Sequence, residues 1–192
     1  MNYKRLKDAK SFLDVLYENF EILENGDWLD LPAGITSEEV LKNDICNFIM
    51  YVIASDETIT TEEVEIYRFF TGYGGDDMES IKGYIEESDV MSYDFQSKPP
   101  YSLIILINAT NAILRNNPDA DANISKMLEL YLLVFMMIGK EMMQADERVS
   151  YAEKQDYETY LDTIKAYVKR HSYVNVDGAI AKLMTSLSDF VN

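Results

Sequence analysis

Two copies of one short motif each contain the same three carboxylates, and these six side chains have the clearest capacity for chemistry. Residues 54–63 and 144–153 share the motif at a constant offset of 90 residues. Carboxylate oxygens suit Ca²⁺ or Mg²⁺, and crowded carboxylates either take up protons or recruit a cation. If the two copies lie side by side, a divalent-cation site would draw on the acids of both, which are Asp56, Glu57, Glu63, Asp146, Glu147 and Glu153.

Helix capping is the alternative role of the same motif. The hydroxyl of Thr60 or Ser150 is placed to accept the backbone N–H three residues further on, which belongs to Glu63 or Glu153. That glutamate can reach back to the N–H of the capping residue, and the aliphatic residue before the cap can form a hydrophobic staple. Each copy therefore predicts a helical hairpin joined by an acidic turn, whether or not a metal binds.

The other chemically capable residues are in positions typical of structural roles. Cys46, the one cysteine, lies among apolar residues at helical spacing, which favours a buried thiol over a nucleophile. His171, the one histidine, follows Lys169 and Arg170 at an expected helix end, where a cation interacts well with terminal carbonyls. We expect no catalytic residues and no enzyme activity.

The elements that must position these residues are all helical by their apolar spacing and end signals. The chain is expected to be one all-α domain over 1–192, a compact bundle of about eight helices containing two pseudo-repeated hairpins, with halves near 36–90 and 121–175. Thr36 with Glu39 predicts a further capping box. Residues 130–138 are apolar almost all round, which predicts a helix at the centre of the bundle.

The charge balance is strongly acidic. Asp and Glu number 34 against 17 Lys and Arg, for a net charge of -17. Between Ser11 and Tyr67 there are fourteen carboxylates and a single base, Lys42. Such a field repels nucleic acid and anionic lipid and attracts basic proteins, although solubility alone is a sufficient reason for many acidic surfaces.

Cellular location is predicted from cysteine usage and apolar segments. A single cysteine excludes an intramolecular disulfide, and the charged first ten residues lack the apolar run of a signal peptide. The longest apolar stretch, residues 130–138, is about half the length that a bilayer crossing requires. A cytoplasmic protein without membrane insertion is expected.

The repeated motif resembles that of the TerB-like tellurite-resistance family, which is related to the N-terminal helical region of DnaJ-like co-chaperones. The resemblance covers roughly residues 44–70 and 134–164 and consists of an apolar helix, Asp-Glu, a variable residue, an aliphatic residue, Ser or Thr, two residues and Glu. It implies a compact all-helical bundle with two pseudo-equivalent halves and acidic turn residues that bind metal. The acids that match the family positions are Asp56, Glu63, Asp146 and Glu153, whereas Glu57 and Glu147 replace the usual glycine.

Together these features predict a non-enzymatic, acidic helical binding module. It would dock a protein partner, which the charge suggests is basic, and would hold Ca²⁺ or Mg²⁺ as its only expected cofactor if the acidic turns meet. The alternative is an acidic inhibitor or immunity-like protein that neutralises a basic protein such as a nuclease. Salt sensitivity separates charge-driven docking from chelation, because only the former weakens steeply with ionic strength.

Overall fold

A computed structural model of the chain is all-α, as predicted. It describes residues 3–56, 59–73, 79–80, 82–83, 98–145, 151–175 and 181. Within these residues there is no β-strand. The α-helices are α1 (Tyr3–Asn25), α2 (Ser37–Ile53), α3 (Thr61–Thr71), α5 (Tyr101–Asn116), α6 (Asp121–Met143) and α7 (Tyr151–His171), and two 3₁₀ turns, η1 (Ala54–Asp56) and η3 (Pro118–Ala120), adjoin α2 and α6.

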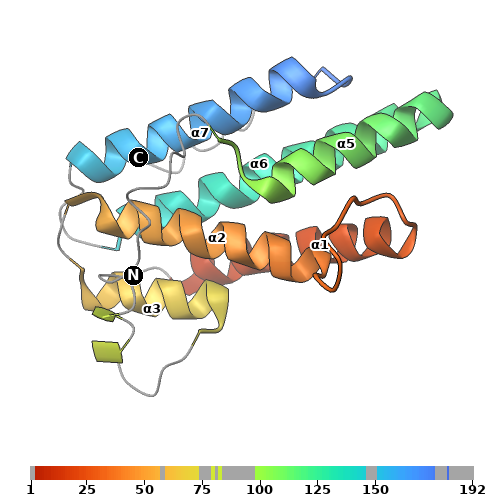
Figure 1. Ribbon diagram of the computed structural model, residues 1–192. Coiled ribbons are helices and arrows are strands. Elements are labelled where there is room, and N and C mark those ends of the chain that lie inside the picture. The colour runs from red at the N-terminus through yellow and green to blue at the C-terminus, as the bar shows by residue number, and fades with distance from the viewer. Residues whose placement is uncertain are drawn as a thin grey trace.

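Two helices, α2 and α6, form the centre of the bundle. Each contacts the other, and both contact α1, α3, α5 and α7. Figure 1 shows α7 along one side of this central pair and α3 along the opposite side, beyond α2. The middle of α6 is buried from Tyr131 to Met142 except for Leu133 and Met137, so the predicted central helix is confirmed.

The apolar length of α6 also bears on membranes. The helical stretch Pro118–Met143 is long and apolar enough to cross a bilayer by length and composition, and half of its most apolar window is buried inside the protein. A core helix of a soluble protein meets the same criterion, so this finding is weak support for a membrane span. The uninterrupted apolar run of residues 130–138 lies within this helical stretch.

Local end signals decide where several helices begin and end. Thr36 and Thr60 both cap their helices through complete capping boxes, with Glu39 and Glu63 as the reciprocal partners. These two predictions are confirmed. Gly72 ends α3 with φ +66°, a left-handed conformation that glycine adopts without steric cost.

The expected eight helices and two pseudo-repeated halves do not match the described structure. Six α-helices lie in the described residues, and the two other expected helices, near 77–87 and 176–190, fall mostly outside them. The hairpins also differ in length, because α3 has 11 residues and α7 has 21. Gly72 ends α3, whereas the position 90 residues later is Asp162, inside α7. The copies thus share a motif rather than a whole half-domain.

Candidate functional site

The first helix, α1, buries one stripe and leaves the opposite face open. Its buried stripe packs on α6 and α2 with the three- and four-residue spacing of an amphipathic helix. The residues of that stripe are Leu6, Ala9, Leu13, Leu16, Phe20 and Leu23, all at most 3 % exposed. The helix is therefore anchored to the core along one face, and its opposite face is left open to solvent.

The outer face of α1 carries a line of exposed apolar side chains. Phe12, Val15 and Ile22 are 40 %, 45 % and 66 % exposed. They are three and seven residues apart, which places them on one side of the helix. Single exposed apolar residues are normal on a protein surface, but an aligned set is typical of a contact surface.

Carboxylates flank this apolar line. Asp14, Glu18 and Glu21 are exposed, and Asp14 pairs with Lys10 at 2.5 Å. Glu18 and Glu21 form no ion pair within the described part of the chain. Exposed Asp27, in the connector, extends the acidic surface. We call Phe12, Val15, Glu18, Glu21 and Ile22 the α1 face.

The acids of the α1 face lie in the C-terminal half of their own helix, away from the N-terminus where the helix dipole favours carboxylates. Negative charge is favoured within the first turn of a helix, and positive charge within the last turn, by about 0.3–1 kcal/mol per exposed group. The other helices with flanking charges follow the favourable rule: α2 and α3 have acids in the first turn, and α7 has bases in the last. In α1 the first turn contains no acid and the last turn no base. Glu18 and Glu21 therefore have neither a favourable position in the first turn nor an ion pair within the described part of the chain.

Bases at the start of α1 have a local explanation. The Arg5 guanidinium donates to the Gln144 side chain at 2.8 Å, at the end of α6. Arg5 also opposes the effect of burial on the pKa of Glu141. These contacts hold the first turns of α1 against α6, whereas Glu18 and Glu21 further along the helix form no ion pair within the described residues.

Most of the predicted metal ligands lie outside what the structure describes. Glu57, Asp146 and Glu147 are outside the described residues, and for Asp56 only the backbone, in η1, is described. The backbone of η1 does contact α7, the helix that follows the second acidic turn. Convergence of the two sets of carboxylates stays a prediction.

The two glutamates of the motif that are described have capping positions. Glu63 is 1 % exposed, and its Oε2 accepts the Thr60 N–H at 2.8 Å and the Thr60 hydroxyl at 2.9 Å. Glu153, in the first turn of α7, is also 1 % exposed. Among the described residues no three His, Cys, Asp or Glu side chains are grouped to hold a metal ion. The geometry of Glu63 supports the capping alternative.

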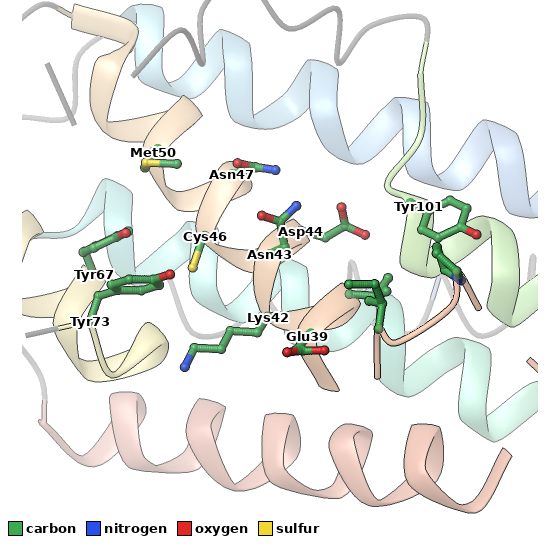
Figure 2. A pocket seen from close by; sticks show the side chains of 13 residues that line it. Glu39, Lys42, Asn43, Asp44, Cys46, Asn47, Met50, Tyr67, Tyr73 and Tyr101 are labelled. Carbon is green, nitrogen blue, oxygen red and sulfur yellow. The ribbon is translucent and has the colours of Figure 1, made fainter. Parts of the chain in front are cut away.

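A groove of about 640 Å³ lies beside α2, between α3, α5 and the connector before α2. Figure 2 shows Tyr67 and Tyr73 on one side of the α2 side chains and Tyr101 on the other. Lys42 lies over the Tyr73 ring, 5.5 Å from its centroid. Burial raises the pKa of the Cys46 thiol to about 11, although Lys42 and Tyr67 oppose the rise. A thiol with that pKa is a poor nucleophile at neutral pH, as predicted for a structural cysteine.

Asp44 is a buried residue whose role sequence reasoning missed. Its carboxylate accepts the Ser102 N–H at 2.6 Å, so a residue of α2 caps the start of α5. Pro100, at the N-cap of α5, provides no side-chain hydrogen bond. Burial raises the pKa of Asp44, and its hydrogen bonds with Ser102 and Tyr101 limit the rise. The spacing of Leu41, Asp44, Ile45 and Phe48 places Asp44 on a buried stripe, a signal that was available in the sequence.

Lys140 and Glu141, adjacent residues of α6, are also buried although both are ionisable. They are 8 % and 6 % exposed and follow the apolar run of residues 130–138. Burial lowers the pKa of Lys140, as does nearby Arg5, and Glu141 opposes this. Burial raises the pKa of Glu141. Their burial is not expected from the sequence, because charged residues are rarely buried.

His171 and Trp28 have local contacts. The His171 ring lies 4.3 Å from the Tyr167 ring, and its carbonyl accepts a hydrogen bond from the Asn111 side chain at 2.7 Å. Trp28 is 39 % exposed and lies over Gly26, where an added Cβ would be 2.7 Å from the indole. His171 thus has a structural setting, and Trp28 adds an exposed aromatic surface near the end of α1.

Comparisons with protein-family models, with curated proteins and with solved structures give no match to this chain. The fold and the α1 face therefore define an acidic all-α protein whose function has to be argued from its own residues.

Proposed function

We propose that the chain is a non-enzymatic helical binding module that docks a basic protein partner through the acidic surface of α1 and the following connector. The observation that carries the proposal is the exposed pair Glu18 and Glu21, which have no ion-pair partner in the described part of the chain and flank an exposed apolar line. A partner that supplies positive charge would complement these carboxylates. The net charge of -17 would also speed encounter with a basic protein.

A binding role agrees with the settings of the two residues best suited to catalysis. The Cys46 thiol is buried with a raised pKa, and His171 lies at the end of α7 against Tyr167. A thiol with a raised pKa is a weak nucleophile at neutral pH. The proposal accordingly assigns no catalytic residue.

We propose further that the module is of the TerB-like type. Tyr67 and Tyr157, which the repeat aligns, are both buried beside the preceding helix of their hairpin. The Tyr157 hydroxyl donates to the Met136 carbonyl at 3.0 Å. A side-chain hydrogen bond with Tyr67 lowers the pKa of the Cys46 thiol, and Cys46 is the residue that the 90-residue offset aligns with Met136. This likeness supports a duplicated hairpin, despite the unequal lengths of α3 and α7.

An inhibitor or immunity-like protein is a special case of the same function. It would use the same carboxylates to cover the basic surface of an enzyme such as a nuclease. No feature of the described residues favours an enzyme over another basic partner, so the proposal stays with the chemical class.

The test is a titration of the protein with a fluorescent oligolysine peptide at low and at physiological salt. We expect binding that weakens steeply with salt, because the attraction between exposed charges is screened. A variant with Glu18→Gln, Glu21→Gln and Asp27→Asn should bind the peptide about threefold to a hundredfold more weakly, since each of the three charge contacts contributes about 0.2–1 kcal/mol.

A matched control removes the same number of exposed acids elsewhere. The control substitutions are Asp119→Asn, Asp121→Asn and Glu158→Gln. Equal losses in the two variants would mean that only net charge attracts the peptide, and would overturn the proposed surface. Repeating the titration with Ca²⁺ and with a chelator tests the predicted cation site separately, because a preformed metal site responds to the ion rather than to ionic strength.

A further inference from the structure

The exposed side chains of α1 have the spacing of a coiled-coil seam. Phe12, Val15, Asn19 and Ile22 follow one another at intervals of three, four and three residues, which are the a and d positions of a heptad. Asn19 is partly exposed, between two exposed apolar neighbours. A seam of this kind is completed by one helix whose own a and d side chains pack between these residues.

Charge beside the seam restricts which helix can bind. Glu18 precedes the a position of Asn19 and so occupies a g position, where residues of two paired helices form ion pairs. Glu21 extends the acidic surface on the same helix. A complementary helix therefore places lysine or arginine beside its apolar seam.

We propose that the α1 face binds a single amphipathic, basic helix of the partner protein, with Phe12, Val15 and Ile22 as the apolar contacts. The inference rests on the proposed function and specifies where the partner binds and the secondary structure of its bound segment. A second copy of this chain is a poorer occupant, because two molecules of charge -17 repel each other.

The experiment uses two synthetic peptides of equal composition. One has leucine at its a and d positions and lysine at its e and g positions, and the other has the same residues in scrambled order. Titration of the full chain, followed by anisotropy and by circular dichroism, should show at least about tenfold tighter binding of the patterned peptide, with a gain of helix on binding. Sedimentation of the chain alone should show a monomer.

The variant Val15→Ser with Ile22→Ser should lose this preference, because it removes the apolar contacts and keeps both glutamates. Tyr151→Ser is the control, since Tyr151 is 82 % exposed on α7. Melting curves of each variant report whether the fold is retained. The control should bind the patterned peptide as the unmodified chain does.

Three results would overturn the inference: equal binding of the two peptides, equal effects of the two variants, or a dimer that forms through α1. In each case oligolysine binding that depends on Glu18 and Glu21 would leave the proposed function standing. If the unmodified chain binds neither oligolysine nor the patterned peptide, the proposed function itself is rejected. The two failures are therefore distinguishable.

Discussion

Replacing Gly139 by alanine tests a close contact between α6 and α7 in the core. A Cβ at this position would lie 2.3 Å and 2.4 Å from two ring carbons of Tyr157 and 2.8 Å from the Phe48 ring. Real Cβ atoms essentially never come this close to another heavy atom, so α6 and α7 would have to separate or the rings would have to move. Tyr157 cannot withdraw freely, because its hydroxyl donates to the Met136 carbonyl at 3.0 Å in the buried interior.

The expected loss of stability is the balance of one stabilising contribution and two destabilising ones. Alanine gains up to about 1 kcal/mol over glycine in a helix interior. Overpacking of a well-filled core costs about 1–3 kcal/mol. Breaking the buried Tyr157 hydrogen bond costs a further ~1–3 kcal/mol. We expect Gly139→Ala to lower the free energy of unfolding by about 1–5 kcal/mol, and Tm by about 2–20 °C for a chain of this size.

Urea unfolding followed by circular dichroism measures this loss directly. Gly83→Ala is the matched control, because an added Cβ there meets no atom within 4 Å, and it should leave stability unchanged or raise it slightly. In a Tyr157→Ala background, Gly139→Ala should cost less than in the unmodified chain, since the nearer of the two clashing rings is gone and only the Phe48 ring, 2.8 Å away, remains. A Gly139→Ala protein as stable as the unmodified chain would refute the packing of α6 against α7 described above.

Two further predictions concern buried ionisable groups. Because burial raises the pKa of Asp44 above its ordinary 3.8, the stability of the unmodified chain should fall relative to Asp44→Asn as the pH rises from about 4 through the folded-state pKa, by about 1.4 kcal/mol for each pH unit of elevation. Urea unfolding of both proteins from about pH 4 to pH 7 checks this, and a stability difference that does not vary with pH would contradict it. Cys46, with a pKa raised from 9.0 to about 11, should react with iodoacetamide at about pH 8 at least roughly a hundredfold more slowly in the native than in the unfolded chain. Mass spectrometry of the alkylated protein measures both rates, and similar rates would mean that the thiol is accessible.

The candidate surface was visible in the sequence only in part. The excess of carboxylates between Ser11 and Tyr67 predicts an acidic region. In the folded chain these carboxylates have different roles. Glu24 accepts the backbone N–H of Ser37 at 2.9 Å and so ties α1 to the start of α2, while Asp44 is buried as a cap. Glu18 and Glu21 lie exposed beside an apolar line. Charge counting cannot separate these roles, because burial depends on which helix packs against each side chain.

What the sequence determined by itself was local: the helical class, and the helix ends at Thr36, Thr60 and Gly72. A capping box joins groups three residues apart, and a left-handed glycine needs only its own backbone, so both can be predicted from neighbouring residues. The tertiary structure alone decided that Asp44 caps a helix 58 residues away and that Gly139 lets the Tyr157 ring approach α6. These contacts join residues whose proximity is created by the packing of whole helices, and no short-range pattern along the chain contains that information.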